Sequence, residues 1–250
     1  MTDLAIIGGT GLNKLEGINI IRRRVMRTPY GEPSGPLTYG EINGNEIVFL
    51  PRHGTGHTIP PHKINYCANI WALKEIGVKE VISIAAVGGI NNKLAPAQLA
   101  VPDQIIDYTW GRENTFYEGG AGKVIHIDFT HPYDNALRTR IINAAQKAGI
   151  AIFEGGTYGA TQGPRLETAA EIDRMEKDGC DLVGMTGMPE ASLARELDLA
   201  YACCAVVANH AAGRGDKEEI SMKEIELYLN KAMQQVRELL IVVLSNPSST

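Results

Sequence analysis

The stretch after Leu50 combines two residue types that bind anions. Arg52 and His53 directly follow an apolar run that ends at Leu50, and the residues after them are rich in Gly, Pro and His. A guanidinium group offers a planar fork that matches phosphate oxygens, and an imidazole adds a donor or carries a proton. A surface arginine beside a histidine that bonds within its own loop is the competing interpretation. That interpretation is usually favoured, but the Gly, Pro and His content here argues for a shaped loop.

A glycine-rich turn near the N-terminus offers a second set of anion donors. Gly8-Gly9-Thr10-Gly11 follows an apolar run, so backbone N–H groups can approach an anion and the Thr10 hydroxyl can add a bond. The turn lacks both the GxGxxG spacing of a dinucleotide site and the lysine of a P-loop. Taken alone, it fits an ordinary tight turn equally well.

Three more candidate positions stand where apolar runs end. Ala85 and Ala86 are small enough to leave backbone amides accessible, although close packing explains them equally well. Thr186 can donate to an anion, and Met185 before it can pack against a sugar or a base. Asn209 ends an apolar run and can read a substrate with its amide, or simply form a turn.

These positions fall at the ends of elements that the hydrophobic pattern predicts. Short apolar runs alternate with helical periodicity along the chain, which is typical of an α/β domain with a mainly parallel or mixed sheet. In such folds, ligands bind in the loops at the carboxyl ends of strands. We expect strands within 4–7, 37–50, 81–86, 181–185 and 200–208, and helices within 64–75, 137–148 and 222–243.

The same pattern sets the limits of the domain. Asn43-Gly44 tolerates positive φ and predicts a hairpin turn. We interpret the apolar stripe of the last helix, which starts at Met222, as core. Because no internal repeat or linker interrupts the chain, we expect one domain over residues 1–244 and a disordered tail over 245–250.

Composition excludes several classes of function. The chain has 250 residues, is 44% hydrophobic and 21% charged, and carries a net charge of −5, which is ordinary for a soluble globular protein. The run Arg22-Arg23-Arg24 is too short for a nucleic-acid site and predicts a solvated strand face or an interface. No segment approaches the ~20 apolar residues of a membrane span. We therefore expect a cytoplasmic protein without nucleic-acid or membrane partners.

Cysteines and histidines do not form a metal pattern. The four cysteines show no CxxC spacing, and Cys203-Cys204 lies inside an apolar run, which predicts buried thiols. His53, His57 and His62 are close in sequence, but no carboxylate or cysteine accompanies them, so we expect no metal.

Five stretches together resemble the methylthioadenosine/S-methyl-5′-thioinosine phosphorylases, a branch of the purine nucleoside phosphorylases. They are IIGGTGL, RHGTGHTIPPHKINYCANIWALKEIG, GPRLET, DLVGMTGMPEASLARE and YACCAVVANHAAG. They occur in the family's order and cover most of the chain. The resemblance implies a single-domain purine nucleoside phosphorylase-like fold, with a central mixed sheet flanked by helices.

The resemblance also implies roles for individual residues. The family usually has a threonine where Ala85 stands, so one hydroxyl is missing from that wall. Met185 is expected against the ribose and base, and His126 of the VIHIDF stretch in the 5′ pocket of a neighbouring subunit. The phosphate ligands would be Thr10, Arg52, His53, Ala85, Ala86 and Thr186, and the purine would face Asn209, His210 and Ala211.

The purine segment departs from the pattern of adenine-specific members. Those members carry aspartates at both positions that Asn209 and Ala211 occupy here. Adenine presents an N7 acceptor beside an N6 donor, whereas a 6-oxopurine presents two acceptors, N7 and O6. An asparagine NH₂ can donate toward N7 and O6. Since an unpaired polar group in a dry pocket costs roughly 1–3 kcal/mol, the sequence favours 5′-methylthioinosine over 5′-methylthioadenosine.

The 5′ end of the substrate is less sharply specified. The resemblance places Leu166 and Glu167 at the ribose and 5′ contacts. Leu166 suits an apolar 5′ group, but Glu167 could equally serve a hydroxyl. Phosphorolysis of inosine or guanosine is therefore an alternative, as is a 5′-methylthioadenosine phosphorylase.

The implied reaction is phosphorolysis in purine salvage, giving hypoxanthine and 5-methylthioribose 1-phosphate. Asn209 would be the catalytic residue, because it can stabilise electron density that moves into the purine. Inorganic phosphate is the co-substrate, and no metal or organic cofactor is expected. Family members are commonly trimers, so we expect a homotrimer, with a hexamer left open. A nucleoside hydrolase and a non-catalytic purine-binding protein are the alternatives from other classes, and the phosphate ligands argue against both.

Overall fold

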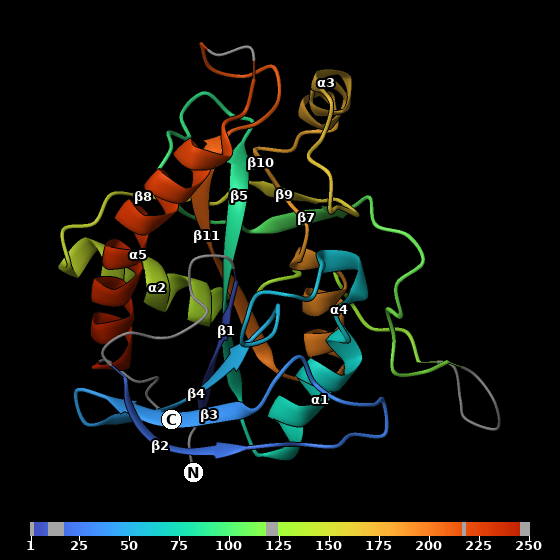
Figure 1. The fold of residues 1–250 in the computed structure, drawn as a ribbon, viewed down its shortest axis with the longest axis vertical. Helices are drawn as coiled ribbons and strands as arrows, with labels where there is room; N and C mark the ends of the chain where they lie inside the picture. Colours follow the sequence, from blue (N-terminus) through green and yellow to red (C-terminus); the bar gives the residue numbers. More distant parts are fainter. Residues whose placement is uncertain (1–2, 10–17, 119–124, 217–218, 246–250) are drawn as a thin grey trace.

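The computed structural model describes residues 3–9, 18–118, 125–216 and 219–245, and it shows one mixed sheet flanked by helices (Figure 1). Its strands follow the order β2-β3-β4-β1-β5-β10-β9-β7, and β11 branches from β5 toward β6 and β8. The predicted fold class is confirmed. Thr10 and the tail 246–250 lie outside the described residues. No helix in the described part of the chain is both long and apolar enough to cross a membrane.

The N-terminal quarter builds one wing of the sheet. β3 (Leu37–Ile42) and β4 (Asn45–Pro51) form the predicted hairpin, and Asn43 at its turn has a φ of 49°. β1 (Leu4–Gly8) is wholly buried and pairs in parallel with β4. β2 (Asn19–Arg24) is exposed along its whole length and lies at the edge, so the arginine run is a solvated strand face.

Two long parallel strands form the centre of the molecule. β5 (Glu80–Gly89) pairs with β1 on one side and with β11 (Ala200–His210) on the other, both in parallel. The carboxyl ends of β1, β4, β5 and β11 therefore meet at one edge. Along β11, successive side chains alternate between two cores: Tyr201 and Cys203 enter one, while Ala202 and Cys204 enter the other.

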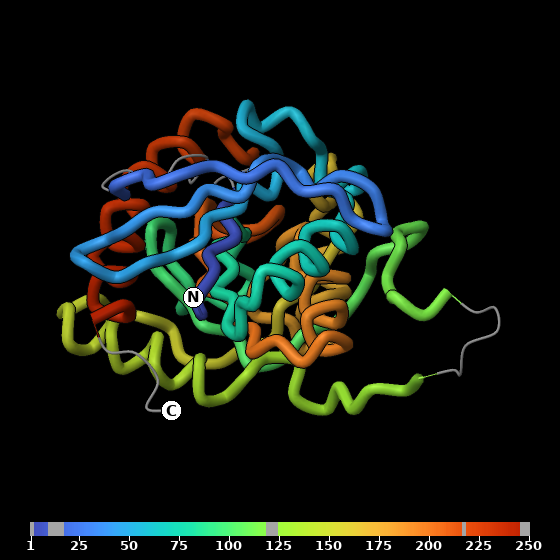
Figure 2. The backbone as a smooth tube through the Cα atoms, turned by 90° about the horizontal axis from the view of Figure 1, so that it is seen from below, coloured from blue at the N-terminus to red at the C-terminus, as the bar shows by residue number. Residues whose placement is uncertain are grey.

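The remaining strands are short, with three or four residues each; β10 confirms the strand predicted within 181–185, whereas the other four have too few residues for a periodic pattern to predict. They are β6 (Leu99–Val101), β7 (Gln104–Asp107), β8 (Ile152–Glu154), β9 (Thr157–Ala160) and β10 (Leu182–Gly184). Between β7 and α2, the described parts of the chain run outward beyond the helices (Figure 2).

Helices cover both faces of the sheet. α1 (Tyr66–Glu75) and α4 (Gly187–Glu196) pack together on one face, and α2 (Asn135–Lys147) and α5 (Met222–Leu244) pack on the other. α3 (Ala169–Lys177) lies at one end, and η1 (Pro61–Lys63) is a single 3₁₀ turn.

Side-chain caps explain where three helices begin. Asn65, Asp134 and Thr168 accept hydrogen bonds from backbone N–H groups in the first turns of α1, α2 and α3. Thr168 completes a capping box with Glu171. All four cysteines are buried free thiols, as the sequence predicts.

Candidate active site

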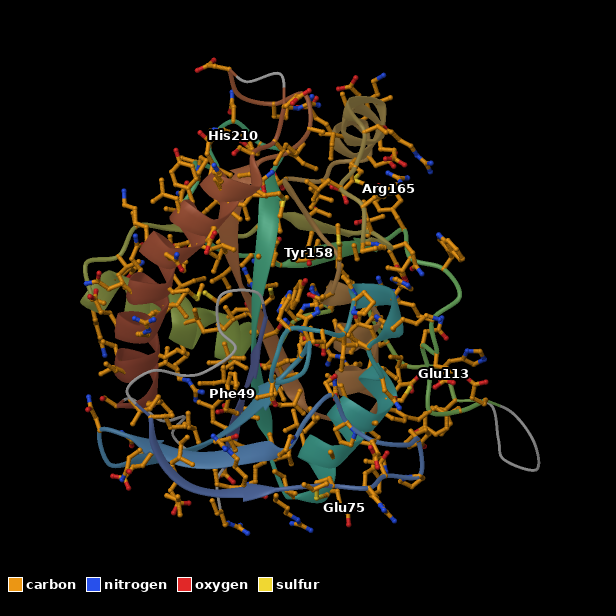
Figure 3. All side chains as sticks on the ribbon, viewed as in Figure 1. Phe49, Glu75, Glu113, Tyr158, Arg165 and His210 are labelled. Atoms are coloured by element: carbon orange, nitrogen blue, oxygen red, sulfur yellow. The ribbon has the colours of Figure 1, made fainter. Side chains whose placement is uncertain are left out.

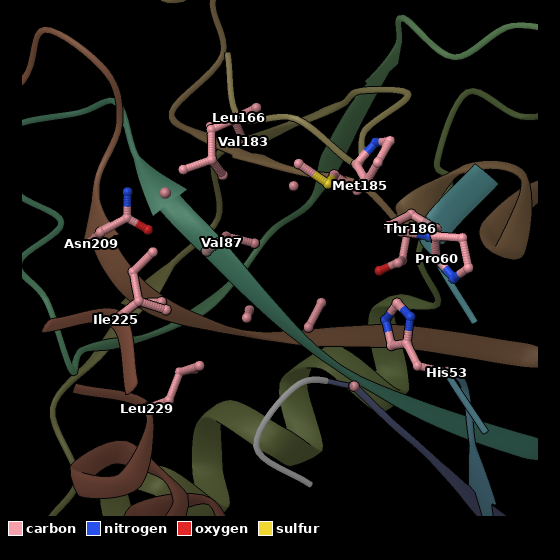
Figure 4. A pocket seen from close by; sticks show the side chains of 18 of the residues that line it. His53, Pro60, Val87, Leu166, Val183, Met185, Thr186, Asn209, Ile225 and Leu229 are labelled. Carbon is pink, nitrogen blue, oxygen red and sulfur yellow. The ribbon is translucent and has the colours of Figure 1, made fainter. Parts of the chain in front are cut away.

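A cavity of about 420 Å³ opens where the parallel strands end (Figure 4). Polar groups stand at its two ends: His53 and Thr186 at one, Asn209 at the other. The cavity brings together ten of the candidate residues: Arg52, His53, Ala85, Ala86, Leu166, Glu167, Met185, Thr186, Asn209 and Ala211.

Three candidates are not among these lining residues. Thr10 lies outside the described residues, although Gly9 before it lines the cavity. His210 lines an adjoining cavity of about 540 Å³ instead of the first one. His126 is exposed, on the part of the chain that runs outward, and does not line this cavity. Its predicted contact with a neighbouring subunit stays a prediction.

Arg52 is fully buried beside His53 and is held by four hydrogen bonds. Its Nε and Nη2 donate to the Glu190 carboxylate at 2.7 and 2.8 Å. Nη2 also donates to Ser83 Oγ at 2.6 Å, and Nη1 donates to the Ile84 carbonyl at 2.9 Å. Since a guanidinium has five N–H groups, these four bonds leave one N–H on Nη1 to meet an anion.

The electrostatics of this pair favour a permanent charge on Arg52. Burial disfavours the charged form, but the Glu190 carboxylate outweighs it and raises the pKa of the guanidinium above its ordinary value. Gly9 passes close by: a Cβ there would stand 2.8 Å from Arg52 Nη1 and 2.6 Å from the Ile84 oxygen. Glycine at position 9 is therefore required by the close approach of Ile84 and Arg52.

His53 is oriented by its own loop. Its Nδ1 lies 2.8 Å from the Ile59 carbonyl oxygen, and because a carbonyl only accepts, Nδ1 carries the proton. Burial, followed by the charge of Arg52, lowers the pKa of His53 to about 4. At neutral pH the imidazole is therefore uncharged, with Nε2 left as an acceptor.

The turn between β10 and α4 supplies the opposite wall. Thr186 is the N-cap of α4, and Met185 precedes it. Gly163 has a φ of 60°, and any Cβ there would collide with the Met185 sulfur. The GPRLET loop and the Met185 side chain thus fit each other only with glycine at this position.

An amide and a carboxylate, those of Asn209 and Glu167, also line the cavity. Asn209 Nδ2 donates to the His210 carbonyl at 2.6 Å, which leaves one N–H and the carbonyl oxygen of the amide. Glu167 accepts a hydrogen bond from the Thr161 hydroxyl at 2.6 Å. Both side chains line the main cavity and the adjoining one, so they mark the boundary between the two.

The first turns of α5 form an apolar wall, which corrects the interpretation of that helix as core alone. Met222, Ile225 and Leu229 line the cavity, and Met222 is 67% exposed. The residues that follow in the stripe are buried as expected. An amphipathic period does not tell a core face from a cavity face, so the sequence pattern could not separate the two.

The comparisons with known proteins agree with this geometry. The family model described as the phosphorylase superfamily matches residues 3–245. The chain belongs to the phosphorylase superfamily. Its predicted membership is thereby confirmed.

Several relatives within the phosphorylase superfamily are named as nucleoside phosphorylases. A protein of Xanthomonas campestris pv. campestris named "Probable S-methyl-5′-thioinosine phosphorylase" is 54% identical over 237 residues, 95% of each chain. A 6-oxopurine nucleoside phosphorylase of Pyrococcus furiosus is 44% identical over 97% of this chain and 92% of its own. The structure of methylthioadenosine phosphorylase from Schistosoma mansoni in complex with adenine is similar to this one, with a TM-score of 0.93 and 32% sequence identity. The match covers 98% of this chain and 91% of the Schistosoma mansoni chain.

Two residues that hold the site together, Glu190 and Arg112, are not among those predicted from the sequence. Glu190 stands in the MTGMPE motif, but its pairing with Arg52 spans 138 positions of the chain. Arg112 lies outside every apolar run, yet it reaches the turn of Met185. The place of Glu190 in the MTGMPE motif was the one available sequence signal, and its complete burial in the structure fits its pairing with Arg52, because a glutamate is rarely fully buried without a partner.

Proposed function

We propose that the protein cleaves 5′-methylthioinosine with inorganic phosphate, giving hypoxanthine and 5-methylthioribose 1-phosphate. One observation carries the proposal: a single cavity joins an anion site at Arg52 and His53 to a purine-reading wall at Asn209 and Glu167. The names of the relatives from Xanthomonas campestris and Pyrococcus furiosus support it.

The phosphate end holds the nucleophile. The remaining N–H of Arg52, the Thr186 N-cap and nearby backbone amides offer donors to phosphate oxygens. The neutral His53 accepts a hydrogen bond from a phosphate hydroxyl, which fixes the orientation of the anion. A phosphate oxygen then attacks C1′ while the glycosidic bond breaks on the opposite face, and its negative charge stabilises the positive charge on the sugar.

The purine end receives the leaving electrons and selects the base. The Asn209 amide donates to N7 or O6, where negative charge develops as the bond breaks. For Glu167 we propose a role at the base in place of the ribose and 5′ contacts that the resemblance implies, because its carboxylate is a fixed acceptor that matches the N1–H of a 6-oxopurine, whereas adenine presents an acceptor at N1. Ala211 supplies no carboxyl group to serve the amino group of adenine. These features support hypoxanthine as the base released.

The apolar wall supports a methylthio group at the 5′ position. Met222 and Ile225 present hydrocarbon and sulfur to the cavity. A thioether can be buried against these surfaces without leaving a polar group unpaired. Phosphorolysis of inosine or guanosine is the second candidate, favoured by the 44% identity with the Pyrococcus furiosus enzyme.

The proposed reaction needs no metal or organic cofactor, because phosphate supplies the nucleophile and the purine leaves as a stabilised anion. We further propose a homotrimer that acts in cytoplasmic purine salvage. Trp110 is 72% exposed and Tyr117 38%, both on the part of the chain that runs outward, and exposed aromatic side chains of this kind suit a subunit interface. Sedimentation velocity tests the proposed homotrimer. A monomer in solution would overturn this proposal.

A substrate comparison tests the proposed reaction. We would measure kcat/KM for 5′-methylthioinosine, 5′-methylthioadenosine, inosine and adenosine, each with and without phosphate. Methylthioinosine should have the highest value, and turnover should require phosphate. Preference for methylthioadenosine would refute the assignment of the base, and cleavage without phosphate would identify a hydrolase.

A further inference from the structure

Arg112 binds the back of the turn that carries Met185 and Thr186. Its Nη1 donates to the main-chain oxygens of Met185 at 2.9 Å and Met188 at 2.5 Å. Its Nη2 donates to the main-chain oxygens of Thr161 at 3.1 Å and Gln162 at 2.9 Å. One side chain thus ties the end of β9 to the start of α4.

The segment that carries Arg112 is fastened along α4. The Thr115 hydroxyl and the Phe116 N–H each donate to the Glu196 carboxylate at 2.7 Å, at the last residue of the helix. Phe116 also packs edge-on against Tyr30. Residues 112–116 therefore form a strap that contacts α4 at both ends (Glu113 within it is labelled in Figure 3).

α4 in turn carries much of the phosphate site. Thr186 is its N-cap, and Glu190 in its first turns holds Arg52 by two hydrogen bonds. Met188 in this region has non-helical angles, φ −119° and ψ 140°, so helical hydrogen bonds alone do not fix the turn. The position of Thr186 and of Arg52 depends on where this turn sits.

We propose that Arg112 is a positioning residue that sets the phosphate affinity of the site without touching phosphate. The inference rests on the proposed function only for the identity of the anion. The guanidinium is suited to this role because its planar fork presents donors in several directions at once, which an ammonium group does not reproduce.

The test compares Arg112→Met, which keeps the unbranched apolar stem and removes the guanidinium, with Arg112→Lys, which keeps the positive charge. Arg138→Met is the matched control, because Arg138 donates to two main-chain oxygens, Pro102 and Val101, away from the cavity. We would measure the Kd of inorganic phosphate by calorimetry, together with the KM for phosphate and kcat for methylthioinosine.

We expect R112M to raise the Kd and KM of phosphate by about tenfold or more, with kcat at saturating phosphate much less affected, because misplacing binding groups by a fraction of an ångström is costly. R112K should fall between R112M and the parent protein, and R138M should stay within about twofold. A phosphate Kd in R112M and R112K equal to that of R138M overturns the proposal. A parent protein that binds phosphate but cleaves no nucleoside overturns the proposed function instead, and the Kd comparison still decides the role of Arg112.

Discussion

Arg52 and Glu190 form a doubly hydrogen-bonded ion pair in which both side chains are fully buried. Tyr201 donates a further bond to the same carboxylate at 2.8 Å. The pair fixes the guanidinium at the proposed phosphate site and leaves only one of its N–H groups for the anion. Its geometry makes the two residues depend on each other.

Glu190→Gln should therefore be strongly destabilising. Removing the carboxylate charge leaves the Arg52 cation buried without compensation, which costs about 3–5 kcal/mol of unfolding free energy. Tyr201→Phe removes only one hydrogen bond to Glu190 and should cost about 1 kcal/mol. Urea unfolding of both variants checks the prediction. Equal losses in the two variants would show that the charge of Glu190 is not what stabilises the pair.

Gly9→Ala should disturb the same site through Arg52 Nη1, which lies next to Gly9. The new Cβ would stand 2.6 Å from the Ile84 oxygen and 2.8 Å from Arg52 Nη1, closer than atoms can pack, so the backbone or Arg52 must move. We expect a loss of about 1–3 kcal/mol in stability and a clear rise in the KM for phosphate. Gly56→Ala is the control, because its Cβ would meet nothing closer than 3.5 Å. Phosphate kinetics that match in the two variants would contradict the prediction.

The sequence predicts the strands that position this site better than the long-range contacts that join its residues. The strands that end at Gly8, Pro51 and Gly89 are marked by apolar runs and glycines, and their parallel pairing brings Arg52 and Asn209 to one cavity. These are local signals, and they suffice for the fold class and for most of the lining residues.

Long-range contacts explain what the sequence does not predict. Glu190 is identifiable as a partner of Arg52 only once α4 packs against β11 and β9, because the two residues are far apart in the chain. Arg112 acts through carbonyl oxygens, which every residue has, so no residue type marks its targets. Met222 and Ile225 share their period with the core residues of α5.

The pH dependence of stability should report the environment of His53. Burial, followed by the charge of Arg52, lowers the pKa of His53 to about 4, below its ordinary value of 6.5. The unfolded chain therefore binds more protons between these values, so stability is lost as the pH falls from about 6.5 toward 4. His53→Gln should flatten this part of the curve in urea unfolding at a series of pH values. An identical slope in the variant would show that other groups cause it.

Glu167→Gln should change which base is preferred. The carboxylate accepts the N1–H of hypoxanthine in the proposed complex, and a hydrogen bond to a charged group contributes about 1.5–3 kcal/mol. A glutamine can also donate to the N1 of adenine, so the ratio of kcat/KM for methylthioinosine over methylthioadenosine should fall by about tenfold or more. The KM for phosphate should hardly change. A ratio that stays constant would place Glu167 away from the base.

Ile225→Thr should separate the 5′-methylthio group from the 5′-hydroxyl. The substitution replaces part of the hydrocarbon wall by a hydroxyl, and each buried CH₂ is worth about 0.8 kcal/mol. We expect kcat/KM for methylthioinosine to fall about three- to tenfold while that for inosine is unchanged or rises. Leu227→Thr is the control on the same helix, because Leu227 is 64% exposed and does not line the cavity. Equal losses for both nucleosides would mean that Ile225 contacts a part of the substrate that the two share, and the 5′ assignment of this wall would then be wrong.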